Sequence, residues 1–113
     1  MVARKELECA IAETDSDGIT WVTLNRPEKR NAMSPQLHYD MEEIMMEVEV
    51  DPDTKVIVLT GAGNSWSAGM DLREYFRATD GNPGEQFRSF TANRHWSWDI
   101  LSNSPKPTIA MVN

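Results

Sequence analysis

The stretch LTGAGNSWSAGMDL, Leu59 to Leu72, has the clearest chemical potential in the chain. Three glycines follow a strand-like run and precede an Asp-Leu pair. Glycine is favoured where the backbone turns sharply or approaches another group closely, and it costs conformational entropy on folding. Backbone N–H groups at the start of a helix point outward and carry partial positive charge. The stretch therefore predicts either a loop that binds an oxyanion or carbonyl, or a plain turn.

Other binding motifs fit this chain poorly. No Gly-Lys-Ser/Thr follows the glycines, and GAG at 61–63 lacks the third glycine of a dinucleotide fingerprint. A net charge of -7 and a pI near 4.7 argue against general attraction to nucleic-acid phosphates. A local basic patch of Arg26, Lys29 and Arg30 stays open as an anion site.

The two histidines, the single cysteine and two of the tryptophans are predicted to have structural and not catalytic roles. His38 and His95 have no carboxylate or nucleophile at a recognisable spacing, so both are predicted to be ordinary surface or edge histidines. Cys9 has no metal-ligand spacing around it and is read as a small apolar strand residue in a reducing, cytoplasmic protein. No metal site is predicted. Trp96 and Trp98 fit helix packing better than a stacking platform.

The elements before the loop are a hairpin, a helix and a strand. Strands are predicted at Leu7–Glu13 and Ile19–Asn25, around the turn TDSDG. Ser34-Pro35 predicts a helix start, and the helix has one apolar stripe and an acidic, solvated face. The stripe consists of Leu37, Met41, Ile44, Met45 and Val48, and the face of Glu42, Glu43, Glu47 and Glu49. Lys55–Thr60 is a β-branched run typical of a strand covered on both sides.

The elements after the loop are two helices and a strand. A short helix is predicted at Asp71–Arg77 and a long one at Glu85–Leu101, with GNPG between them. The apolar positions of the long helix are Phe87, Phe90, Trp98 and Leu101. Thr108–Val112 is predicted to be a buried strand. This alternation is typical of a layered α/β protein, in which loops after strands bind ligands.

The chain of 113 residues fits one small domain. No apolar run approaches the roughly 18 residues of a membrane span, and the N-terminus lacks the apolar core of a signal peptide. A protein without contact to membranes or nucleic acid is expected. The last predicted strand has no successor, so we expect the sequence to be truncated.

Three segments, LNRPEKRNAMS, LTGAGNSWSAGMDLREY and KPTIAMVN, together resemble the enoyl-CoA hydratase/isomerase (crotonase) superfamily. The resemblance is greatest to its p-hydroxycinnamoyl-CoA (feruloyl-CoA) hydratase-lyase branch. It implies an α/β crotonase-like ββα spiral, of which residues 1–113 are the N-terminal part of a single domain, incomplete at the C-terminus. It also implies assembly as a homotrimer or a hexamer of two trimers, with no prosthetic group.

The resemblance implies roles for several loop residues. Met70 matches the position whose backbone N–H binds the thioester oxygen, where fixed donors stabilise an enolate as it forms. Positions that hold the coenzyme A end of the substrate match Lys29, Arg30, Ala32, Ala68, Asp71 and Leu72. Tyr75 matches the tyrosine that binds the 4-hydroxyl of an aromatic acyl group, and Trp66, assigned with it to the substrate-binding site, is placed under the loop.

The implied activity is hydration of a 4-hydroxycinnamoyl-CoA and cleavage to an aromatic aldehyde, such as vanillin, and acetyl-CoA. The family's second oxyanion donor and its glutamate acid/base lie beyond Asn113, so the 113 residues alone are expected to be inactive. Two alternatives stay open. One is an enoyl-CoA hydratase or isomerase acting on other acyl-CoAs, and the other is a noncatalytic chain that binds CoA or caps a partner.

Overall fold

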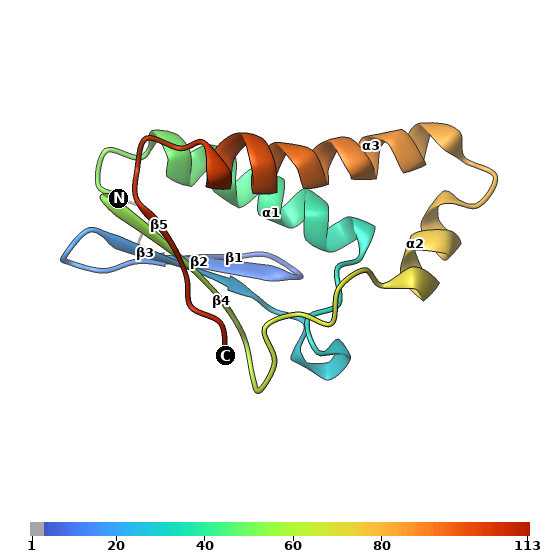
Figure 1. Cartoon of the computed structure of the whole chain (residues 1–113), viewed down its shortest axis with the longest axis horizontal. Helices are drawn as coiled ribbons and strands as arrows, with labels where there is room; N and C mark the ends of the chain where they lie inside the picture. Colours follow the sequence, from blue (N-terminus) through green and yellow to red (C-terminus); the bar gives the residue numbers. More distant parts are fainter. Residues whose placement is uncertain (1–3) are drawn as a thin grey trace.

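The computed structural model describes residues 4–113 as one mixed β-sheet with helices packed over one face (Figure 1). The strands, in spatial order, are β1 (Arg4–Glu6), β2 (Ala10–Thr14), β3 (Ile19–Leu24), β4 (Val56–Gly61) and β5 (Thr108–Ala110). The helices are η1 (Pro27–Lys29, 3-10), α1 (Pro35–Val50), α2 (Leu72–Thr79), α3 (Pro83–Arg94) and η2 (His95–Ser102, π-helical). The predicted α/β class is confirmed.

The first three strands form an antiparallel meander that contains the predicted hairpin. The turn between β2 and β3 is closed by the Asp15 carboxylate, which accepts hydrogen bonds from the Asp17 and Ile19 N–H groups. β2 begins at Ala10 instead of Leu7 because the Leu7 N–H bonds the Ala10 carbonyl oxygen and forms a turn out of β1.

Strands β3, β4 and β5 run parallel, with Ile19 paired to Val56 and Ile57 paired to Thr108. Parallel neighbours need crossover connections. Helix α1 supplies the first crossover, and α2, α3 and η2 supply the second. The carboxyl ends of the three strands therefore lie at one edge of the sheet, and the glycine loop leaves β4 there.

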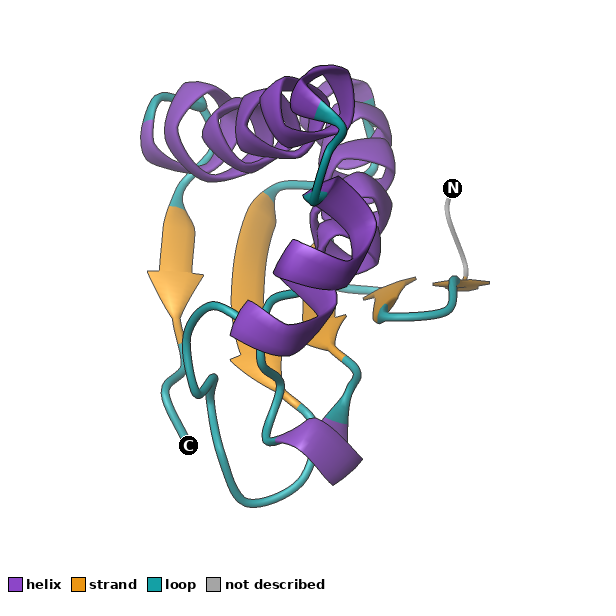
Figure 2. Ribbon diagram, turned by 90° about the vertical axis from the view of Figure 1, so that its right-hand side faces the viewer, coloured by secondary structure: helices purple, strands orange, loops and turns teal. Residues whose placement is uncertain are grey.

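Helix α1 begins where the sequence predicts. The Ser34 hydroxyl caps it by accepting the Leu37 N–H at 3.1 Å, and Pro35 occupies the first turn. Asp51 forms the C-cap. All five residues of the predicted apolar stripe are buried, and they pack against inward-facing side chains of β2, β3 and β4. Figure 2 shows α1 and α3 stacked above the strands.

The apolar positions named for the long helix do not share one buried face, and of the four only Leu101 packs, partly buried, against the core. Phe87, Phe90 and Trp98 are 72%, 47% and 65% exposed, whereas Ser89, Ala92, Trp96 and Ile100 are buried. The small side chains of Ser89 and Ala92 let α3 lie close to α1. The wider π-helical turns of η2 then direct Trp96 and Ile100 into the core.

The prediction of a buried last strand is also wrong. Every residue of β5 is exposed, and Ile109 is 53% exposed. The strand order explains this, because among the strands of residues 4–113 β5 lies at the edge of the sheet and pairs with β4 alone. β4 is the well-covered strand, with Ile57, Val58 and Leu59 all buried.

None of the helices within residues 4–113 is long and apolar enough to cross a bilayer. In the same part of the chain, no three histidine, cysteine or acidic side chains cluster in a way that could hold a metal ion.

Candidate functional site

The glycine loop folds back on itself directly after β4. A Cβ atom on Gly61 would lie 2.6 Å from the carbonyl oxygens of both Ser65 and Trp66, which is closer than real Cβ contacts allow. Gly69 has a φ of +91°, a conformation that other residues rarely adopt. The close approach and the left-handed turn explain why glycine is required at these two positions.

The loop docks along the segment that follows β3. The Ala68 N–H donates to the Arg30 carbonyl oxygen at 2.9 Å, and the Met33 N–H donates to that of Gly69 at 2.7 Å. The Asp71 N–H donates to the Met33 carbonyl oxygen at 2.9 Å, so Met33 and Met70 form an isolated parallel β-bridge. The structure thereby brings together the two groups of predicted CoA-binding residues, 29–32 and 68–72.

The backbone N–H of Met70 is free within this docked loop. The neighbouring N–H groups of Ala68, Gly69 and Asp71 donate to the Arg30 carbonyl, the Ser67 hydroxyl and the Met33 carbonyl, respectively. Among residues 4–113 the Met70 N–H meets no acceptor, and the residue is 48% exposed. A bridge residue in a parallel pair directs its own N–H away from its partner. The geometry thus leaves this one backbone donor without a partner within the described chain.

Asp71 caps helix α2 and pairs with Arg26. Its Oδ1 accepts the Glu74 N–H at 3.0 Å, and its Oδ2 lies 3.0 Å from Arg26 Nη1. Partial burial raises the pKa of the Asp71 carboxyl, but the Glu74 N–H and the Arg26 guanidinium more than offset this and hold the pKa below its usual value. Asp71 is therefore an ionised, fully engaged carboxylate.

The basic patch expected at Arg26, Lys29 and Arg30 is smaller than predicted. The Arg26 side chain is only 11% exposed because it is engaged with Asp71. Lys29 and Arg30 lie exposed at the end of η1, available to an anion. Ala32 is half-buried beside them, while Ala68 and Leu72 are exposed across the loop.

Asn31 joins the two segments, a role that the sequence analysis missed. The residue is fully buried with a left-handed φ of 56°, and its amide nitrogen donates to the carbonyl oxygens of Ala62 and Ser65. Its Oδ1 accepts the Arg26 N–H at 2.8 Å. Asparagine is several-fold enriched at positive φ, so an Asn in a polar segment after a strand was the available signal.

Tyr75 lies on the buried side of α2 and is 7% exposed. Its ring stacks on Phe90 with centroids 5.5 Å apart and meets the edge of the Phe76 ring at 5.4 Å. Its hydroxyl oxygen is buried and has no hydrogen-bond partner within the described chain. Buried hydroxyls are normally paired, so this group lacks a partner that a ligand could supply.

Trp66 packs against the core under the loop, as predicted. It also lines an apolar cavity of about 250 Å³ between the loop, the end of η2 and β5.

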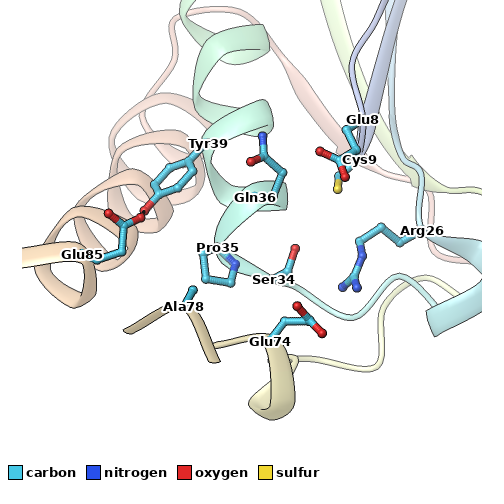
Figure 3. A pocket seen from close by; sticks show the side chains of 10 residues that line it. All are labelled: Glu8, Cys9, Arg26, Ser34, Pro35, Gln36, Tyr39, Glu74, Ala78 and Glu85. Carbon is cyan, nitrogen blue, oxygen red and sulfur yellow. Dashed lines mark hydrogen bonds between the residues drawn. The ribbon is translucent and has the colours of Figure 1, made fainter. Parts of the chain in front are cut away.

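A second, polar cavity of about 280 Å³ lies where the start of α1 meets β2, α2 and α3 (Figure 3). It is lined by Glu8, Cys9, Arg26, Ser34, Pro35, Gln36, Tyr39, Glu74, Ala78 and Glu85. Neither Met70 nor Tyr75 lines it. Cys9 is buried, but it lies in the turn before β2 and not in a strand as predicted. Burial, together with nearby Asp40 and Glu8, raises the pKa of its thiol to about 11. A thiol with so high a pKa is a poor nucleophile at neutral pH.

His38 differs from the prediction of an ordinary surface or edge histidine. His38 is 8% exposed, and its Nδ1 accepts the Trp96 indole N–H at 3.2 Å. Burial lowers the pKa of His38 to about 4, so the ring is neutral. His95 is half-buried, and its Nδ1 lies 2.9 Å from a carboxylate oxygen of Glu42. Sequence spacing could not reveal these partners because they come from different helices.

The profile of the enoyl-CoA hydratase/isomerase family matches residues 14–113. The chain belongs to this family. It is 53% identical over 100 residues to a hydroxycinnamoyl-CoA hydratase-lyase of Pseudomonas fluorescens, covering 86% of this chain and 36% of that protein. It is 34% identical over 103 residues to enoyl-CoA delta isomerase 2 of Rattus norvegicus, covering 91% and 26%.

Solved structures of the enoyl-CoA hydratase/isomerase family share this fold. An enoyl-CoA hydratase/isomerase from Xanthobacter autotrophicus Py2 superimposes with a TM-score of 0.78 at 29% identity, over 96% of this chain and 39% of its own. The predicted crotonase fold is thereby confirmed. The chain spans well under half the length of these relatives.

Proposed function

We propose that the protein is a 4-hydroxycinnamoyl-CoA hydratase-lyase. Water adds across the α,β-double bond of the thioester, placing a hydroxyl on the benzylic carbon and a proton on the α-carbon. The hydroxyl then loses its proton as the bond between the α- and β-carbons breaks. The products are a 4-hydroxybenzaldehyde, such as vanillin, and the enolate of acetyl-CoA, which takes up a proton.

The Met70 N–H is the donor that this chemistry needs. Both steps pass through negative charge on the thioester oxygen, and a preorganised donor stabilises that charge without reorganising. The group has no partner among residues 4–113, belongs to a residue that is 48% exposed, and is fixed by the flanking hydrogen bonds of the bridge to Met33. The Met70 side chain affects only the shape of the site.

The observation that carries the aromatic substrate class is the Tyr75 hydroxyl, which is buried without a partner. In this proposal it donates to the 4-oxygen of the acyl ring. A hydrogen bond to a phenolate is charge-assisted and stronger than a neutral one. The stacked Phe90 and the edge-on Phe76 hold the Tyr75 ring in place. The identity of 53% to a hydroxycinnamoyl-CoA hydratase-lyase supports the same substrate class.

The coenzyme A end of the substrate is assigned to the two docked segments. Lys29 and Arg30 provide positive charge for its phosphates, in a chain of net charge -7, while Ala32, Ala68, Asp71 and Leu72 surround it. Coenzyme A enters as part of the thioester substrate and not as a prosthetic group. We further propose a cytoplasmic protein that assembles as a trimer or as two trimers.

The substrate class is tested by comparing kcat/KM for feruloyl-CoA, cinnamoyl-CoA and crotonyl-CoA, using the protein at the length its source cell makes. We expect feruloyl-CoA to be preferred. Tyr75→Phe should lower kcat/KM for feruloyl-CoA about 10- to 100-fold, the effect of one lost hydrogen bond to a charged group. Cinnamoyl-CoA has no 4-hydroxyl, so its turnover should not change.

Tyr39→Phe is the matched control, because Tyr39 donates its hydroxyl hydrogen to Glu85 on α3 and lies outside the proposed site. It should leave the preference for feruloyl-CoA intact. Preferred turnover of crotonyl-CoA would instead favour an enoyl-CoA hydratase or isomerase. Binding of every thioester without turnover would favour the noncatalytic alternative.

A further inference from the structure

We propose that Arg26 is a positioning residue that holds the Met70 N–H in its donor orientation. This inference rests on the proposed function, in which that N–H binds the thioester oxygen. Arg26 follows β3 directly, whereas Met70 lies beyond the glycine loop that follows β4. The two residues therefore belong to segments that only the fold brings together.

One guanidinium nitrogen of Arg26 joins the two segments. Nη1 donates to the Ala32 carbonyl oxygen, one residue before the bridge residue Met33. The same nitrogen donates to Asp71 Oδ2 at 3.0 Å, one residue after the bridge residue Met70. Arg26 therefore connects the residue before Met33 to the residue after Met70, next to the bridge that these two residues form.

Burial strengthens this link. The Arg26 and Asp71 side chains are 11% and 12% exposed, so the pair is screened less than the exposed ion pairs of the chain. The Arg26 guanidinium lies at the wall of the polar cavity in Figure 3. The backbone N–H of Arg26 donates to Asn31 Oδ1. The side chain and the backbone of Arg26 are therefore both fixed.

The link determines the direction of the Met70 N–H because that group has no restraint of its own. Its orientation follows from the peptide planes on either side, which are held by the Met33 N–H on Gly69 and by the Asp71 N–H on Met33. Loss of the Arg26 contact would leave the bridge held by these two hydrogen bonds, with the remaining ties between the segments lying earlier in the loop, at Ala62, Ser65, Ser67 and Ala68. A misplaced donor stabilises the enolate less, even when the substrate still binds.

The first test needs no ligand. Hydrogen exchange of the Met33 and Asp71 amides would be measured by NMR in the 113-residue chain and in Arg26→Ala. We expect exchange of both amides to accelerate about tenfold or more, the size expected for one charge-assisted hydrogen bond. Amides of the β2–β3 hairpin should not change. Unchanged exchange at Met33 and Asp71 would overturn the proposal.

The second test measures the hydrogen bond that the Met70 N–H donates to the thioester carbonyl. The infrared carbonyl band of feruloyl-CoA, labelled with ¹³C at the thioester carbon, should move to lower frequency on binding to the wild-type chain. Arg26→Ala should lose at least about half of that shift. Its affinity for the thioester should weaken about threefold at most, since the N–H is misdirected and not removed.

Two further variants separate positioning from general damage. Asp71→Asn keeps an oxygen that can cap α2 but removes the charge that Arg26 meets, so it should reproduce both effects of Arg26→Ala. Arg77→Ala removes an exposed arginine that pairs with Glu74 at 3.7 Å on the same helix, and it should reproduce neither. Equal carbonyl shifts in wild type and Arg26→Ala would refute the positioning role.

The two experiments distinguish failure of the Arg26 positioning role from failure of the proposed function. If the Arg26→Ala amides exchange faster but wild type shows no carbonyl shift, the bridge is held as inferred and the proposed function is wrong. If wild type shows the shift and Arg26→Ala exchanges normally, the function stands and Arg26 does not position the donor.

Discussion

Met70 contributes to the proposed site through its backbone, which places unusual demands on a mutational test. Side-chain replacement cannot remove the N–H, and proline would also restrict the preceding residue, Gly69, whose φ is +91°. The informative change is an amide-to-ester substitution at Met70, which deletes the N–H and keeps the side chain.

We expect the Met70 ester to lower kcat for feruloyl-CoA by about 10²- to 10³-fold, the usual cost of one oxyanion donor. Met70→Leu is the control and should stay within about twofold of wild type, because it keeps the N–H and a similar volume. Single-turnover kinetics on the semisynthetic protein would measure the chemical step. An ester variant with wild-type kcat would exclude this N–H as the donor.

Asn31 and Arg26 show where residue-level prediction reaches its limit. The sequence grouped Arg26 with Lys29 and Arg30 as one basic patch because charge is visible in sequence and partners are not. Only the fold shows that Asp71 neutralises Arg26 and that Asn31 is buried with a left-handed backbone. Consecutive residues at positive φ, Arg30 and Asn31, are uncommon and cluster at functional sites.

At the scale of elements, α3 and η2 illustrate why a helical face can be misread. Trp96 and Trp98 are two residues apart, so they lie on different faces of the helix. Trp96 is 3% exposed and Trp98 is 65% exposed. The π-helical turns of η2 change the residue spacing on which an α-helical periodicity depends.

Replacing Trp96 and Trp98 one at a time measures which of the two side chains lies in the core. Trp96→Ala should lower the free energy of unfolding by about 3–5 kcal/mol, the usual cost of a large core deletion. Trp98→Ala should change it by about 0.5 kcal/mol or less, as at most surface positions. Urea denaturation of both variants tests the assignment. A larger loss of unfolding free energy for Trp98→Ala than for Trp96→Ala would show that η2 buries Trp98 and not Trp96.

Other elements could be predicted because local signals decided them. Ser34-Pro35 fixed the start of α1, and the stripe from Leu37 to Val48 fixed its buried face. The exposure of β5 could not be predicted, since a continuous apolar run is typical of a central strand and position at a sheet edge depends on topology. The glycine loop was located correctly because its spacing and its place after a strand are both visible in sequence.

At the scale of the whole molecule, His38 connects pH to global stability. The ring is buried between α1 and η2 and accepts the Trp96 N–H, and burial lowers the pKa of His38 from 6.5 to about 4. His38 therefore takes up a proton near pH 6.5 in the unfolded chain, but only near pH 4 in the folded chain. Stability is fully present above the unfolded pKa and is lost as pH falls toward the folded pKa.

We expect the free energy of unfolding to fall by about 1.5 kcal/mol from this residue alone between pH 6.5 and about pH 5. His38→Gln, whose amide oxygen can accept the same N–H, should remove that part of the pH dependence. Denaturant titrations of both proteins across this range provide the comparison. Parallel pH profiles would show that His38 does not titrate as described.

The mixed sheet also has a consequence for the order in which the chain folds. The β1–β2–β3 meander joins neighbours in sequence, and hairpins of this kind close in about 1–10 μs. The parallel pairs and the Met33–Met70 bridge have high contact order, which slows their formation. The proposed oxyanion donor is therefore expected to be assembled late, after the nascent chain has already built the scaffold beneath it.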